Sequence, residues 1–72
     1  MKEVYVVLFA PKGNTLDDFN IILGAATTLE EARDILISHL DENESIIHVA
    51  TNDAHYYYYT NLGSYRITKM YV

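Results

Sequence analysis

The chain has no cysteine, so no disulfide can brace a domain of this size. That absence fits a reducing compartment, and we expect a cytoplasmic protein. No apolar run approaches the length of a membrane span. Glu3 disfavours a signal peptide, because the start of a signal peptide is positively charged. The sequence therefore predicts a soluble protein without an export signal.

Basic residues are also scarce, with five lysines and arginines against ten acids and a formal net charge of −5. Between residues 28 and 44 there are six acids, and Arg33 is the only basic residue. After Asp53 the only charged residues are Arg66 and Lys69. This balance argues against a groove that follows nucleic-acid phosphates. The acids form either a solvated helix face or a contact face for a basic protein partner. They are Glu30, Glu31, Asp34, Asp41, Glu42 and Glu44.

The residues that usually carry catalysis are missing as well. There is no cysteine nucleophile and no glycine-rich phosphate loop. Ser38 and His39 are neighbours in a predicted helix, so they point about 100° apart and cannot act as a pair. His48, Asp53 and His55 could meet across a hairpin, but three metal ligands without a fourth are a weak signal. We expect no enzymatic activity, no cofactor and no structural metal.

Strand-forming residues are abundant. Residues 3–9 (EVYVVLF) are apolar at both alternating sets of positions, which is typical of a central strand covered on both faces. Residues 19–25 predict a second strand, with Gly24 permitting the chain to leave it. Turn residues separate three further strand segments, unless residues 46–59 form one long bent strand. These segments are 45–51, 54–60 and 64–72.

Residues 28–40 (TLEEARDILISHL) have helical periodicity. Thr28 and Glu31 predict a capping box, in which each side chain can bond the backbone N–H of the other residue. Apolar residues recur at spacings of three and four, so one stripe faces a sheet. They are Leu29, Ala32, Leu36 and Leu40. Because acids follow Leu40 at the negative end of the helix, we expect the helix to end near that residue.

The predicted order is β-β-α-β-β-β in a single domain over residues 1–72. We therefore predict an α+β fold with one α-helix packed on a four- or five-stranded antiparallel sheet. The run Tyr56–Tyr59 raises a problem of cover, because an alternating strand buries only every second side chain on one face. Either Tyr56 and Tyr58 or Tyr57 and Tyr59 pack beneath the helix, and the other pair lies on the far face.

This excess of aromatic side chains predicts an interaction surface. Its candidate members are Tyr56, Tyr57, Tyr58, Tyr59, Tyr65 and Tyr71. We expect a homodimer, formed face to face or edge to edge through the final strand. Alternatively, the loop 10–18 folds back as a lid with Leu16 and Phe19. Exposed sheet tyrosines could also stack single-stranded bases beside Arg66 and Lys69, although the acidic net charge disfavours nucleic acid.

The segment IILGAATTLEEARDIL resembles a pattern of small uncharacterised proteins encoded by bacteriophages and mobile elements. In these proteins an aromatic-rich first strand is followed by I-L-G, a T-x-E-E-A helix and a final strand similar to YRITKMYV. The resemblance implies a non-catalytic acidic inhibitor that binds a host protein. The same segment also resembles the G-A-x-x-x-x-E-A-x-x-x-L run of peptidoglycan-binding SPOR domains, but this sequence lacks their second helix and export signal.

Overall fold

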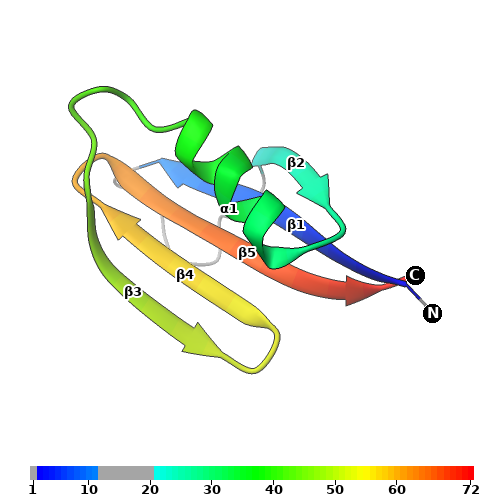
Figure 1. The fold of residues 1–72 in the computed structure, drawn as a ribbon. Helices are drawn as coiled ribbons and strands as arrows, with labels where there is room; N and C mark the ends of the chain where they lie inside the picture. Colours follow the sequence, from blue (N-terminus) through cyan, green and yellow to red (C-terminus); the bar gives the residue numbers. More distant parts are fainter. Residues whose placement is uncertain (1, 12–20) are drawn as a thin grey trace.

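A computed structural model describes residues 2–11 and 21–72. One helix packs on a five-stranded antiparallel sheet, which confirms the predicted fold class (Figure 1). Leu16 and Phe19, on which the predicted lid depends, lie outside the described residues. The described elements are β1 (Glu3–Pro11), β2 (Ile21–Ala26), α1 (Leu29–Ser38), β3 (Ile46–Asn52), β4 (His55–Thr60) and β5 (Gly63–Tyr71).

The strand order is β2-β1-β5-β4-β3, so β1 and β5 lie inside the sheet and β2 and β3 form its edges. The predicted central position of the first strand is confirmed. The prediction that the final strand offers a free edge is wrong, because β5 pairs with β1 on one side and β4 on the other. The physical reason is that β5 pairs along its whole length with β1, from Glu3 opposite Tyr71 to Pro11 opposite Gly63, and a pairing between the two ends of the chain is not specified by local sequence patterns.

β3 and β4 form a hairpin rather than one bent strand. Asn52 pairs with His55, and Asp53 and Ala54 make the turn between them. Asp53 has a φ of 46°, and a positive φ is what a type II′ turn requires of its first central residue. The sequence predicts a turn at Asn52 and Asp53, and the observed turn lies one residue later, because Asn52 still pairs within the hairpin.

Gly63 begins β5 directly after the second turn, where β5 meets the end of β1. A Cβ atom at this position would lie 2.8 Å from the ring of Phe9 and 2.9 Å from the carbonyl oxygen of Ala10. Contacts this short with a backbone atom leave no room for a side chain. Gly63 therefore permits the close pairing of β1 with β5 at this end of the sheet.

The cap of α1 differs in detail from the predicted capping box. The backbone N–H of Glu31 donates to the Thr28 hydroxyl at 3.2 Å, as predicted. The Glu31 carboxylate instead accepts from that same hydroxyl at 3.1 Å, so it does not bond the backbone of Thr28. The helix ends at Ser38, with His39 as its C-cap, two residues before the predicted end at Leu40.

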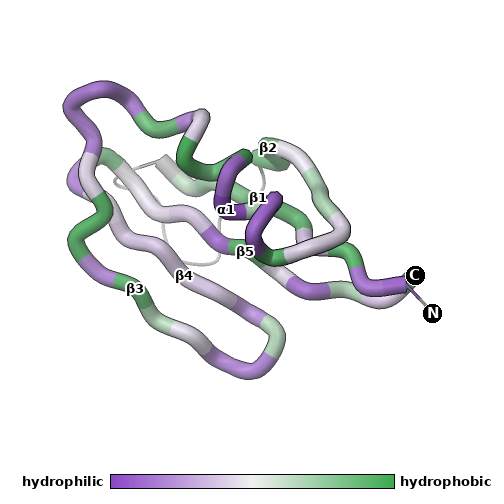
Figure 2. Tube along the Cα trace, viewed as in Figure 1, coloured by the Kyte–Doolittle hydropathy of each residue, from purple (hydrophilic) through white to green (hydrophobic). Residues whose placement is uncertain are grey.

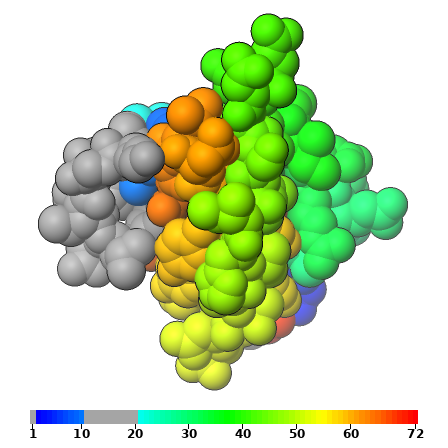
Figure 3. Space-filling model, turned by 90° about the vertical axis from the view of Figure 1, so that its left-hand side faces the viewer, coloured from blue at the N-terminus to red at the C-terminus, as the bar shows by residue number. Residues whose placement is uncertain are grey.

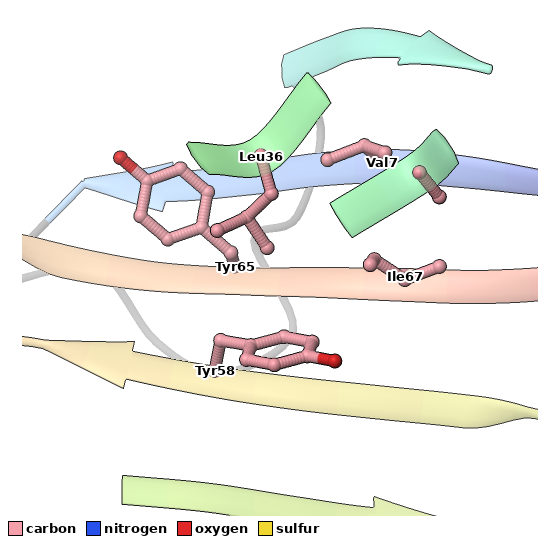
Figure 4. Close-up of a cluster of buried hydrophobic side chains, with 6 residues drawn as sticks. Val7, Leu36, Tyr58, Tyr65 and Ile67 are labelled. Carbon is pink, nitrogen blue, oxygen red and sulfur yellow. The ribbon is translucent and has the colours of Figure 1, made fainter. Parts of the chain in front are cut away.

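The core lies between α1 and one face of the sheet. Leu36 points from the helix into a space bounded by Val7, Tyr65 and Ile67 (Figure 4). Tyr58 closes the same cluster from β4. The helix packs on β2, β1 and β5.

Gly24 has a different role from the predicted one. It pairs with Val7 inside β2, and the strand continues to Ala26, so the chain does not leave the sheet at Gly24. A Cβ at Gly24 would lie 3.3 Å from the Ile35 side chain. The glycine therefore allows α1 to approach β2 closely.

Candidate interaction surface

The helical layer covers only part of the sheet. α1 contacts β2, β1 and β5, and within the described residues it makes no backbone approach to β4 or β3 (Figure 1). A single side-chain hydrogen bond links the helix to β4, from Arg33 Nε to the Tyr58 hydroxyl at 3.1 Å. The side of α1 that carries Arg33 therefore faces β4 and β3, the half of the sheet that the helix does not cover.

The four consecutive tyrosines divide between the two faces as alternation requires. Tyr58 is buried beneath the helix, and Tyr56 packs against the same core cluster. Tyr57 and Tyr59 therefore lie on the far face. Of the four predicted surface tyrosines, Tyr58 belongs to the core of the single chain and is not available to a partner.

Aromatic rings form a row on the far face. Tyr57 and Tyr59 stack with centroids 6.3 Å apart and ring planes 10° apart. His48 stacks on Tyr59 at 5.7 Å, and His55 lies against Tyr57 at 6.1 Å. We call these four rings, His48, Tyr59, Tyr57 and His55, the aromatic row. Such contacts between neighbouring strands stabilise a sheet, so the row contributes to folding whether or not it binds a ligand.

His48 and His55, which the sequence suggested as metal ligands, do not lie opposite each other. The register places His48 opposite Tyr59 and His55 opposite Asn52. The Nδ1 atom of His55 lies 3.1 Å from the Thr68 hydroxyl on β5. No group of three His, Asp or Glu side chains suited to a metal occurs in the part of the chain that the structure describes.

Tyr65 and Tyr71 have opposite environments. Tyr65 is 3% exposed, and its hydroxyl donates to Glu44 Oε1 at 3.2 Å. Burial raises the pKa of Tyr65 to about 12, and the hydrogen bond to the Glu44 carboxylate adds to the rise. Tyr71 is 56% exposed near the chain ends, with Lys69 Nζ 5.8 Å from the centre of its ring. Only Tyr71 of this pair could contact a partner.

Glu44 is half-buried and acts as a structural acceptor. It accepts from the hydroxyls of Thr60 and Tyr65 and from the backbone N–H of Asp41. An open pocket of about 290 Å³ lies beside it. The polar groups of this pocket are already bonded within the chain, so we assign it no chemistry. The pocket is lined by Phe9, Leu23, His39, Asp41, Glu44, Leu62 and Tyr65.

The other predicted acids are exposed. Glu30 and Asp34 lie one turn apart on α1. Arg33 is three residues after Glu30, and Ile37 is three residues after Asp34, so each acid has one of these residues as a neighbour on the helix surface. Glu31 lies on a different side of the helix, next to its cap. Asp41 and Glu42 follow the helix in an exposed loop. The structure thus leaves Glu30 and Asp34 exposed on the outer side of α1 and gives Glu44 a role in the fold.

The prediction missed a set of exposed apolar side chains on β3 and on the outer side of α1. Val49 lies opposite Tyr58 on the helix side of the sheet and is 51% exposed. We call this set of side chains the open surface. Figure 3 shows β3, which carries most of them, along the front of the molecule. Figure 2 shows hydrophobic stretches along β3, at the edge of the sheet away from α1. The open surface comprises Ile37, Ile46, Ile47 and Val49.

A signal for this surface was present in the sequence. Residues 46–52 contain no charged side chain, and Ile37 lies one position outside the apolar stripe of the helix. The predicted surface rested on the tyrosines instead, because their number is unusual. Tyr58 and Tyr65 proved to be core residues, and Tyr56 packs against them, whereas the shorter aliphatic side chains remained exposed.

No family model, curated protein or solved structure matches this chain. The resemblance to phage and mobile-element proteins therefore stays a prediction. Among the described residues, no helix has the length and apolar character needed to cross a membrane.

Proposed function

We propose that this protein is a small, non-catalytic, acidic binding protein that acts through protein–protein contacts. The observation that carries the proposal is the half-sheet that α1 leaves uncovered, where Val49 and Ile47 are 51% and 69% exposed. Apolar side chains gathered in this way mark interaction sites on small proteins. This mode of action is also the one expected of the cytoplasmic phage-type inhibitors that the helical segment resembles.

The surroundings of the open surface indicate the chemistry of the partner. Ile37 is 56% exposed and lies one turn from Asp34 and two turns from Glu30 on α1. A partner with an apolar centre and basic residues at its rim would match both features. Complementary charge at the rim chiefly speeds association and selects the partner, whereas the apolar centre supplies most of the affinity.

Capture from a cell lysate with matched variants tests the proposal. Asp34→Asn and Glu31→Gln each remove one negative charge from α1, but only Asp34 lies one turn from Ile37. Ile37→Ser and Ile22→Ser each remove one exposed isoleucine, the second from the opposite edge of the sheet. We expect Asp34→Asn and Ile37→Ser to weaken capture of a basic protein several-fold, and both control variants to bind as the wild type does. High salt should reduce capture.

The aromatic row favours a second candidate, binding of single-stranded nucleic acid. The strand residues described on the same face of the sheet include no Asp or Glu. Arg66 of β5 lies opposite Tyr57 on this face. Stacking of a base on an aromatic ring contributes about 1–3 kcal/mol. The same capture experiment separates the two functions. Loss of the captured material on nuclease treatment and on Tyr57→Ala, with Ile37→Ser unaffected, would replace protein binding with nucleic-acid binding.

A further inference from the structure

β3 is an edge strand without the usual protection. Its seven residues, Ile46–Asn52, include no lysine, no proline and no other charged side chain. Natural sheets normally place such residues on their edges, because an open edge pairs readily with another strand. Within the described residues no strand pairs with the outer side of β3. Its one irregularity is a bulge between Ile46 and His48 at the start of the strand.

The register shows which backbone groups the open edge presents. In a two-residue hairpin, the pair that closes the turn exchanges both hydrogen bonds, and the bonding direction then alternates along the strand. Asn52 and Ala50 therefore bond β4, whereas Val49 and Thr51 direct their N–H and C=O groups outward. The bond from Lys69 N to Ala54 O at 2.8 Å fits this alternation in the next strand pair.

We propose that two copies of this chain pair antiparallel through β3, about a two-fold axis that passes beside Val49. This inference goes beyond the proposed function. Residues that lie opposite each other in an antiparallel pair have their side chains on the same face of the sheet. A two-fold axis perpendicular to the sheet therefore requires one residue to lie opposite the same residue of the second copy. Centring the axis on Val49 gives the longest overlap of Ile46–Asn52 with its copy. Val49 then meets Val49 of the second copy, and Ile47 meets Thr51.

The side chains along this pairing suit a second copy. Every residue of β3 is uncharged, so no like charges lie opposite each other within the pairing. The nearest acids, Glu44 and Asp53, lie beyond its two ends. Val49 is half exposed in the single chain, and pairing with its own copy covers it on the helix side of the sheet.

The negative charge of the chain does not prevent this dimer. α1 lies over β2, β1 and β5, and β5 is two strands from the β3 edge. With strands about 4.8 Å apart, the β5 strands of the two copies are about 24 Å apart, and the helices are no closer. That separation exceeds the screening length of about 8 Å at physiological salt. The dimer should therefore depend weakly on salt, unlike the contact with a basic partner.

β2, the other edge, is a poorer candidate for pairing. α1 packs closely over it, with Ile35 against Gly24, and a bulge interrupts its pairing with β1. Ile22 is nonetheless 69% exposed there, as exposed as Ile47 on β3. Ile22 therefore provides a matched control position at the opposite edge of the same sheet.

Cysteine cross-linking of the purified chain tests the register directly, because the natural sequence contains no thiol. In the proposed dimer the Cα atoms of the two Val49 residues lie about 5.5 Å apart, within reach of a disulfide. The two Thr51 residues are separated by four positions, more than about 13 Å along the strands. Under mild oxidation we expect Val49→Cys to form a covalent dimer rapidly, at a rate at least tenfold above that of Thr51→Cys.

Light scattering on cysteine-free variants completes the test. The wild type should have twice the 8.3 kDa mass of the chain. Val49→Lys should reduce it to a monomer, whereas Ile22→Lys should remain a dimer; circular dichroism confirms that each variant folds. A wild-type monomer at the highest soluble concentration overturns the proposal. So does equal cross-linking of both cysteine variants, or dissociation by Ile22→Lys alone. No partner protein is present, so failure here is distinct from failure of the proposed function.

Discussion

Tyr65 brings its hydroxyl to Glu44 from within the core, and this contact fixes the loop after α1 to the sheet. Thr60 donates to the other carboxylate oxygen of Glu44, and its own hydroxyl also accepts from the backbone N–H of Gly63 at 3.1 Å. A carboxylate acceptor strengthens the two hydrogen bonds that end on Glu44. The acid that sequence reasoning assigned to a partner face therefore has a clear role inside the chain.

The raised pKa of Tyr65 predicts a loss of stability at alkaline pH. In the unfolded chain a tyrosine loses its proton near pH 10, whereas burial and Glu44 hold the pKa of Tyr65 at about 12 in the fold. Above pH 10 the folded state therefore binds more protons than the unfolded state, and stability falls as pH rises through about 12. Two units of pKa correspond to on the order of 2–3 kcal/mol. Urea unfolding from pH 8 to 12 measures this loss.

Tyr65→Phe and Tyr71→Phe form a matched pair for this measurement. Removing the Tyr65 hydroxyl should lower stability at pH 8, because Glu44 loses a donor, and should flatten the alkaline decline. Tyr71 is largely exposed, so Tyr71→Phe should keep the wild-type profile. An alkaline decline that is the same in all three proteins would contradict the role assigned to Tyr65.

At the scale of elements, the helix and the strands followed from local patterns. The apolar stripe predicted the buried face of α1, and Ala32 and Leu36 are indeed buried. The hairpin turn at Asp53 followed from its turn residues. These features depend on neighbours in the chain, which is why a single sequence predicts them.

The tyrosine faces and the strand order depend on distant contacts. Four tyrosines in succession show no alternation of polarity, so the inward pair is decided by the position of α1 and by the bond from Arg33 to Tyr58. The pairing of β1 with β5 joins the two ends of the chain and makes β3 an edge.

The cap of α1 offers a test at this scale. Thr28→Ala removes the acceptor of the Glu31 N–H and the donor to the Glu31 carboxylate, and it should cost about 1 kcal/mol of unfolding free energy. Thr28→Ser keeps the hydroxyl and should remain close to the wild type. The midpoint of urea unfolding, with an unchanged slope, measures both. Equal midpoints for Thr28→Ala and the wild type would show that α1 is held by packing alone.

For the molecule as a whole, the helix covers one part of one face and leaves an apolar half-sheet beside an uncharged edge. A domain of 72 residues buries little surface on folding and commonly gains stability from a second subunit. The backbone edge of β3 and the open half-sheet beside the acids of α1 thus serve separate contacts. The helix attracts a basic partner, and the strand edge pairs with its own copy.

Residue-resolved amide hydrogen exchange tests the claim that the β3 edge is occupied in solution. The outward N–H groups of Val49 and Thr51 should be protected, and their exchange should slow at least tenfold as protein concentration rises through the dimerisation range. Ala50, whose N–H points toward β4, should be protected at every concentration. Fast exchange of Val49 and Thr51 that is independent of concentration, with Ala50 protected, would contradict the account.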